Sequence, residues 1–247
     1  YIEPAENDTV RVDSGVYEGG EISIYYDPMI AKLIAYGEDR ATATENLQKA
    51  LDGFYIRGVN HNMAFLSALI AHPRFADGNL TTNFISDEYP SGFHAQDLAL
   101  EDPNTLIAVA GVVHQAYQQR AAQISGQFAG HARDVANDWI VVMRDEQHPI
   151  SVQGDYGDYD VTVDGKVLLV SSDWQFEQPL FFSSVDGKDV CIPVARQNIA
   201  YRLSFRGAPV EILELHALVP KLNTKTQFKE PPENAKERAP TLIHILR

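Results

Sequence analysis

Residues 11–37 have the sequence RVDSGVYEGGEISIYYDPMIAKLIAYG. It begins with an arginine in a polar segment, passes a Gly-Gly pair at 19–20, and reaches an apolar run through a Tyr-Tyr-Asp-Pro segment at 25–28. Adjacent glycines permit backbone angles that side chains forbid. Proline disfavours helical geometry at the residue before it. The order predicts a turn, then a corner that leads into an apolar strand.

The run from Met29 to Tyr36 is apolar on both faces apart from Lys32. A half-exposed strand alternates apolar and polar residues, whereas a strand covered on both faces is apolar throughout. We therefore expect a covered strand. From the residues alone, Arg11 is interpreted as a surface or ion-pair arginine.

Two helices are predicted after this strand. In Glu38–Arg57 apolar residues recur every three or four positions, the spacing of one helix face. Gly58 is expected to end that helix. A second helix is expected from about residue 61 or 62 to Ala71, and Thr82–Ile85 is expected to form a short closing or edge strand.

The chain from 102 to 215 predicts a helix enclosed by strands. Asp102 and Pro103 are typical of a helix start, and Leu106–Val113 is apolar almost all round, so most of this helix should be covered. Asp-Gly pairs at 164–165 and 186–187 indicate hairpin turns between short strands, and consecutive hairpins predict an antiparallel barrel around the helix. The eight expected strands are Trp139–Met143, Pro149–Val152, Tyr159–Val163, Val167–Ser171, Leu180–Val185, Lys188–Val194, Ile199–Phe205 and Pro209–Leu215.

Composition narrows the class of protein. The chain has 247 residues, is 45% hydrophobic and carries a net charge of −14, which argues against nucleic acid or an anionic membrane surface as partner. It has no apolar run of about 18 residues, so no membrane span is expected. The single cysteine, Cys191, permits no disulfide and no CxxC metal site, and suits a reducing compartment. The scattered histidines predict no metal site.

Two parts of the chain resemble one known family. RVDSGVYEGG (11–20), YYDPMIAKL (25–33) and GVNHN (58–62) resemble, in order and spacing, the C-terminal part of the biotin carboxylase domain in α subunits of biotin-dependent acyl-CoA carboxylases. DWQFEQPL (173–180) and YRLSFRGAPVEI (201–212) are similar to the linking (BT) domain of the same subunits, an antiparallel barrel around a long helix.

The resemblance implies an α+β fold class: the C-terminal α/β part of a biotin carboxylase (ATP-grasp type) domain, followed by an antiparallel β-barrel of about eight strands around a central helix. The expected domains are 1–90 for the carboxylase part, 91–220 for the barrel and 221–247 for a tail or linker. The Met-Lys-Met setting of a biotinyl lysine, the glycine-rich nucleotide loop and the acidic magnesium ligands of the family are missing. The chain is therefore expected to be a fragment, inactive by itself.

The resemblance also implies site residues. Arg11 takes the place of the catalytic arginine that reaches the ureido ring of biotin, and the alternative for Arg11 is a structural ion pair with Asp13. Asp13 and Ser14 are expected to orient the turn, and residues 25–27 to support packing or α-subunit self-association. Thr82, with Asn83, lies in the region that approaches the adenine of the nucleotide.

The complete family enzyme is a ligase that carboxylates biotin with ATP, bicarbonate and Mg²⁺ or Mn²⁺. The expected acceptor is propionyl-CoA, with acetyl-CoA or methylcrotonyl-CoA as alternatives, and the expected partners are a carboxyltransferase β subunit and a biotin carrier domain. A second hypothesis is a non-catalytic assembly module that only binds the β subunit. The expected location is the bacterial cytoplasm or the mitochondrial matrix.

Overall fold

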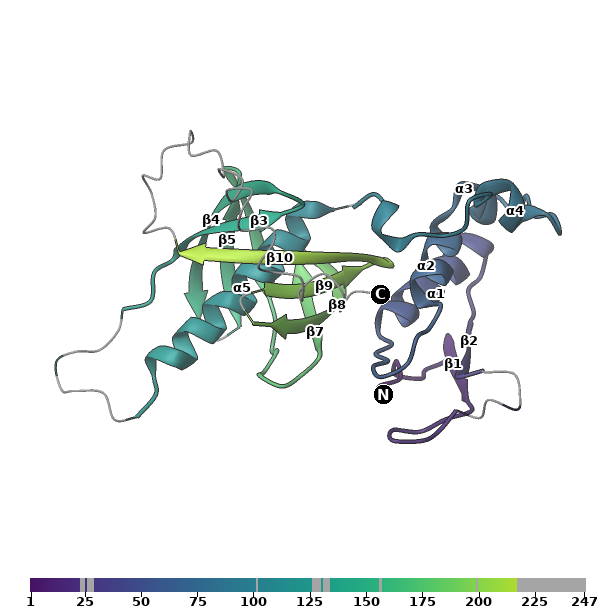
Figure 1. Cartoon of the computed structure of the whole chain (residues 1–247), viewed down its shortest axis with the longest axis horizontal. Helices are drawn as coiled ribbons and strands as arrows, with labels where there is room; N and C mark the ends of the chain where they lie inside the picture. Colours follow the sequence, from purple (N-terminus) through teal and green to yellow (C-terminus); the bar gives the residue numbers. More distant parts are fainter. Residues whose placement is uncertain are drawn as a thin grey trace, which may run out of the picture.

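The computed structural model describes residues 1–22, 25, 29–100, 102–125, 130, 134–155, 157–198 and 200–216. Figure 1 shows two parts side by side. We call residues 1–88 the N-terminal unit and residues 102–216 the barrel unit. A connecting segment with one short 3-10 helix, η1 (Ala95–Asp97), joins them.

Eight antiparallel strands of the barrel unit form a closed barrel in the order β10-β3-β4-β5-β6-β7-β8-β9, which confirms the predicted architecture. The predicted start of one strand, Ile199, lies outside the described residues. The strands are β3 (Asp138–Met143), β4 (Glu146–Asp155), β5 (Asp158–Val163), β6 (Lys166–Ser171), β7 (Leu180–Val185), β8 (Lys188–Gln197), β9 (Ala200–Phe205) and β10 (Ala208–His216).

The hairpin turns explain how this sequence forms a meander. Asp164 and Gly165 have φ values of 49° and 83°, and Asp186 and Gly187 have φ values of 50° and 78°. Two consecutive residues with positive φ are the mark of the turn that best matches the twist of paired strands, and Asp-Gly tolerates it. The predicted hairpin turns are confirmed.

Helix α5 (Pro103–Ala122) fills the barrel, as Figure 1 shows. Asp102 caps it by accepting a hydrogen bond from the Thr105 backbone N–H at 3.2 Å. Every residue from 105 to 115 is buried, so the helix is enclosed on all sides as expected. At Gly111 a Cβ atom would lie 2.6 Å from Ile150 Cδ1, so a larger residue there would require the Ile150 side chain on β4 to move.

The barrel wall has one narrow seam. Strands β6 and β7 pair at two positions, Val170 with Val185 and Ser171 with Ser184, whereas β5 and β6 pair along their whole length. Next to this short pairing, β6 contacts the β7–β8 turn instead of β7: the Leu169 N–H donates a hydrogen bond to Asp186 Oδ1 at 2.9 Å.

The described residues of the N-terminal unit form a two-stranded antiparallel sheet and four helices. Within the described ranges of the whole chain, none of the helices combines the length and apolarity needed to cross a membrane. The elements are β1 (Val10–Ser14), β2 (Ala31–Ala35), α1 (Arg40–Asp52), α2 (Met63–Ala71), α3 (Pro73–Ala76) and α4 (Phe84–Glu88).

The prediction for the first helix end is wrong. Helix α1 ends at Asp52 with Gly53 as its cap, five residues before Gly58. Phe54 leaves the helix axis, keeps one short-range bond from its N–H to the Leu51 carbonyl at 3.1 Å, and is only 4% exposed. Burial of this ring between neighbouring elements outweighs continuation of the helix.

The expected strand at 82–85 is also wrong, because this segment leads into helix α4. Phe84 is buried and its ring lies edge-on to His72, with ring centroids 5.2 Å apart. Glu88 accepts a hydrogen bond from Arg74 and lies 3.2 Å from His72 Nε2. These contacts with the end of α2 and with α3 stabilise one helical turn, and the Arg74 guanidinium holds the pKa of Glu88 below its usual value.

The covered strand expected over Met29–Tyr36 is half-exposed instead. Among the described residues β2 pairs with β1 alone, and Met29 and Tyr36 are about half exposed. Helix α1 contacts the sheet and covers part of it. Part of the apolar surface of residues 29–36 is therefore not buried by the described residues.

Because α5 is enclosed, we expect that shortening one of its buried side chains strongly lowers the free energy of unfolding. Ile107 is fully buried in the barrel, so Ile107→Ala should lower the free energy of unfolding by about 2–5 kcal/mol. Val167→Ala, on the half-exposed outer face of β6, should change it by about 0.5 kcal/mol or less. Urea unfolding followed by circular dichroism measures both, and equal losses would contradict the central role of α5.

Candidate functional site

The strand pair β1–β2 places charged residues on one face. In the antiparallel register Arg11 lies opposite Ile34, and Asp13 lies opposite Lys32. Residues two apart on a strand point to the same side, and directly opposed residues share that side. Arg11, Asp13 and Lys32 therefore stand together on this face.

The Arg11 guanidinium is held at two points by Asp13. Its Nε lies 3.1 Å from Oδ1, and its Nη2 donates to Oδ2 at 3.2 Å. Both side chains are about half exposed, and within the described part of the chain Nη1 makes no hydrogen bond. The pair thus orients a permanent positive charge and leaves donors directed to solvent. The geometry contains the ion pair that the sequence offered as the alternative and is also compatible with binding of an anionic oxygen.

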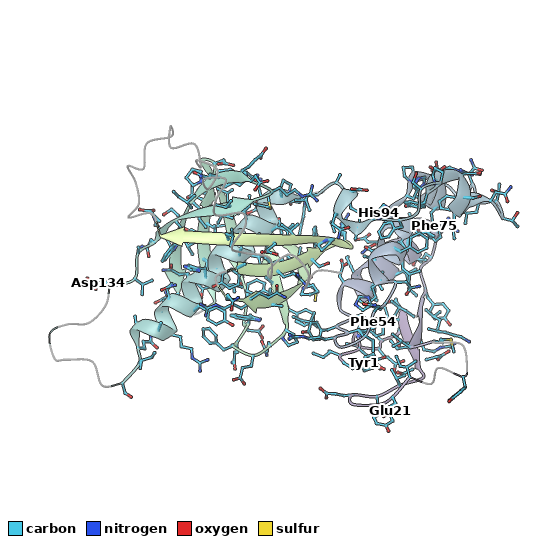
Figure 2. The ribbon with its side chains drawn as sticks, in the orientation of Figure 1. Tyr1, Glu21, Phe54, Phe75, His94 and Asp134 are labelled. Atoms are coloured by element: carbon cyan, nitrogen blue, oxygen red, sulfur yellow. The ribbon has the colours of Figure 1, made fainter. Side chains whose placement is uncertain are left out.

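Hydrogen bonds from Ser14 connect the end of β1 to the turn that follows it and to the first residue of the chain. Ser14 Oγ donates to the Val16 carbonyl at 2.8 Å and lies 3.0 Å from the Tyr1 hydroxyl. Figure 2 shows Tyr1 near Phe54, and their ring centroids are 6.1 Å apart. Sequence reasoning missed Tyr1 and Lys32; the isolated lysine in the apolar run was the available signal for Lys32.

The other predicted site residues do not gather around Arg11. Thr82 and Asn83 are exposed in the segment before α4, and Figure 1 shows α4 and β1 at opposite ends of the N-terminal unit. Tyr25 is 86% exposed, while residues 26 and 27 lie outside the described residues. Across the ranges described, no three His, Cys, Asp or Glu side chains come together as metal ligands.

A second candidate region lies where α5 leaves the barrel, and we call it the mouth cluster: Tyr117, Arg120, Trp174, Phe176 and Arg196. The ring centroids of Tyr117 and Phe176 are 4.9 Å apart. Arg120 stacks over Phe176 at 4.7 Å and Arg196 over Tyr117 at 4.6 Å. The DWQFEQPL segment therefore packs against the last turns of α5 through Trp174 and Phe176.

Below the mouth, the polar groups of α5 find partners inside the barrel. His114 Nδ1 lies 3.1 Å from the Tyr201 hydroxyl, and the Trp139 indole N–H donates to Gln115 Oε1 at 2.9 Å. Burial raises the pKa of Tyr201 to about 12, so its hydroxyl keeps its proton. These pairings fix the rotation of α5 within the barrel.

The thiol of Cys191, on β8, is also protonated, because burial raises its pKa to about 12.

Comparison with known families agrees with this two-part architecture. The family model described as "Biotin carboxylase C-terminal domain" matches residues 1–87, and the model described as "Propionyl-coenzyme A carboxylase BT domain" matches residues 106–226. Together they take up most of the chain. Residues 1–87 therefore belong to the family of biotin carboxylase C-terminal domains, and residues 106–226 to the family of propionyl-CoA carboxylase BT domains.

Individual relatives agree with these two families. The chain is 37% identical over 237 residues to the propionyl-CoA carboxylase alpha chain of Ruegeria pomeroyi, covering 94% of this chain and 34% of the relative. It is 38% identical over 244 residues to the mitochondrial propionyl-CoA carboxylase alpha chain of Mus musculus, covering 95% and 33%. A methylcrotonoyl-CoA carboxylase subunit alpha of Dictyostelium discoideum is 39% identical over 120 residues, covering 49% of this chain and 17% of the relative. The chain spans about a third of the length of the two propionyl-CoA carboxylase relatives.

Proposed function

We propose that this chain is part of the α subunit of a propionyl-CoA carboxylase, a ligase that carboxylates biotin with ATP and bicarbonate for transfer to propionyl-CoA. The observation that carries the proposal is the order of the two matched domains, with a barrel around a buried helix as the second. The longer matches to propionyl-CoA carboxylase α chains favour propionyl-CoA over methylcrotonyl-CoA or acetyl-CoA. The relatives are bacterial and mitochondrial, which favours the bacterial cytoplasm or the mitochondrial matrix.

Within that subunit Arg11 is proposed to contact biotin. When bound, biotin supplies a ureido group that accepts the carboxyl. A guanidinium is always charged and can stabilise an oxygen on which negative charge develops. Arg11 has the means for this, because Asp13 orients it while Nη1 stays directed to solvent. Thr82 keeps its proposed place near the adenine of ATP, on the far side of the unit from Arg11.

The barrel unit is proposed to bind a carboxyltransferase β subunit. A biotin carrier domain and, at residues 25–27 of the N-terminal unit, a second α subunit are proposed as further partners of the chain. The mouth cluster supports this role, since aromatic and arginine side chains are enriched where proteins bind one another. Mg²⁺ or Mn²⁺ is proposed as the metal ion of the complete subunit. The proposed domain division is 1–90, 91–220 and 221–247.

A non-catalytic assembly module is the second candidate. It is favoured because the barrel is closed, whereas β1, which carries Arg11, and α4, which follows Thr82, lie at opposite ends of the N-terminal unit. The two candidates differ in whether Arg11 serves chemistry.

The isolated chain is expected to show no bicarbonate-dependent ATP hydrolysis, because the family's nucleotide loop and metal ligands are missing from its sequence. Phosphate release from the purified chain, with ATP, Mg²⁺ and bicarbonate, measures this. A sample without protein is the control, and turnover above that background would contradict the expectation.

The role of Arg11 can be tested in a chimera in which residues 1–216 replace the matching segment of a propionyl-CoA carboxylase α chain. Arg11→Gln should lower the rate of biotin carboxylation by about 100- to 1000-fold, the usual effect of removing a donor to a developing oxyanion. Lys49→Gln, which removes an exposed charge on α1, is the matched control. If both variants retain the parental rate, Arg11 is a structural ion-pair residue and the assembly module is favoured.

Binding of the barrel unit can be measured with the purified chain and an immobilised propionyl-CoA carboxylase β subunit. Phe176→Ala should weaken binding by at least tenfold, because it removes the ring that contacts both Tyr117 and Arg120. Phe182→Ala, at an exposed outer position of β7, should leave binding unchanged. Failure of the unaltered chain to bind would overturn the assembly role.

A further inference from the structure

A cavity of about 360 Å³ lies between the N-terminal unit and the outer wall of the barrel. One wall consists of the end of α1, the loop after it and the start of α2; the other consists of β8, β9 and the start of β10. Figure 2 shows Phe54, a lining residue, on the side of the N-terminal unit that faces the barrel. Neither the biotin carboxylase role nor the assembly role of the chain uses this cavity.

The barrel wall is hollow here because its outward side chains are small. On β8 the inward residues Ile192 and Val194 are buried, so their neighbours point outward. The β9–β10 turn touches α2 directly, since a Cβ on Gly207 would lie 2.7 Å from the Ala64 carbonyl. Because the two units touch at this turn, they stay separated next to it, where the cavity lies. The small lining residues on the barrel side are Pro193, Ala195, Ser204 and Pro209.

The charges that line the cavity are mainly positive. Arg57 comes from the loop after α1 and Arg202 from β9, on opposite walls. Neither has a hydrogen bond or an ion pair with any residue that the structure describes, although Glu211 faces Arg202 in the strand register. Asp52 is the one acidic side chain among the described lining residues. On a chain of net charge −14, two arginines without such partners at one cavity indicate an anionic ligand.

Arg196 also borders the cavity but does not add to this charge. It lies opposite Tyr201, whose side chain points into the barrel, and its guanidinium stacks on Tyr117 at the mouth. His61 is a further lining residue, on the wall formed by the N-terminal unit.

We propose that this cavity binds an aliphatic carboxylate. The headgroup is held by Arg57 and Arg202, and the chain lies against Leu51, Phe54 and Met63. Guanidinium groups bind carboxylates through paired, charge-assisted hydrogen bonds, and the volume falls within the range of about 300–1000 Å³ found for small-molecule sites. Because each unit supplies one arginine, the bound carboxylate ties the N-terminal unit to the barrel.

Titration calorimetry of the purified chain with octanoate tests the proposal. Octanoate should bind saturably and at least tenfold more tightly than octanol, which has the same chain without the charge. Arg57→Met and Arg202→Met should each weaken octanoate binding roughly tenfold, the usual worth of a hydrogen bond to a charged group. Lys166→Met makes the same change in net charge on β6, which does not line the cavity, and should bind as the unaltered chain does.

A second variant tests the space instead of the charge. Ala195→Phe places a ring in the cavity from β8 and should abolish octanoate binding while the far-ultraviolet circular dichroism is unchanged. Equal affinity for octanol and octanoate, no loss in the two arginine variants, or no saturable binding by the unaltered chain would overturn the proposal. If an arginine variant fails to fold, Ala195→Phe and the comparison with octanol decide.

Discussion

Burial of α5 inside the barrel holds the barrel unit together. The helix is apolar on nearly every face from residue 106 to 113, so exposing it to water would be unfavourable. The inward side chains of the strands are apolar as well, and they pack against α5 in one hydrophobic core. Each component therefore removes the apolar surface of the other, and the His114–Tyr201 and Trp139–Gln115 hydrogen bonds select one orientation among the ways in which the helix might fit.

The same enclosure sets where functional groups are found. Side chains within the barrel are occupied with packing, so the groups able to meet a ligand or partner lie at its mouth and on its outer wall. At the mouth, Trp174 and Phe176 surround the end of α5. On the outer wall, small residues of β8–β10 meet the N-terminal unit and leave a cavity that neither unit has alone.

The barrel could be predicted from sequence because its determinants are local. Alternating burial, Asp-Gly turns and an all-apolar helix each act within a few residues, and together they allow one arrangement. The misassigned segments were decided by distant contacts: Phe54 is buried away from the α1 axis, and Glu88 is held by Arg74 and His72. The exposure of β2 depended on what packs against it, which its own residues do not encode.

The candidate sites divide in the same way. The pairing of Arg11 with Asp13 follows from their spacing on one strand, so the sequence indicated it. The position of Lys32 depends on the register of β1 with β2, which places Lys32 opposite Asp13. The cavity joins residues 51–67 to residues 193–209, and no local pattern relates these two segments.

The order of the strands bears on how the chain is made. The wall closes where β10 pairs with β3, the first strand of the barrel, across some seventy residues (Ile212 with Met143 at one end). Since synthesis proceeds from the amino end, α5 emerges before any strand that will surround it, and the last gap shuts only when the final strand arrives. A chain cut short of Ala208 would leave a strongly apolar helix in an open trough with two free strand edges, which is a template for aggregation rather than a smaller working domain.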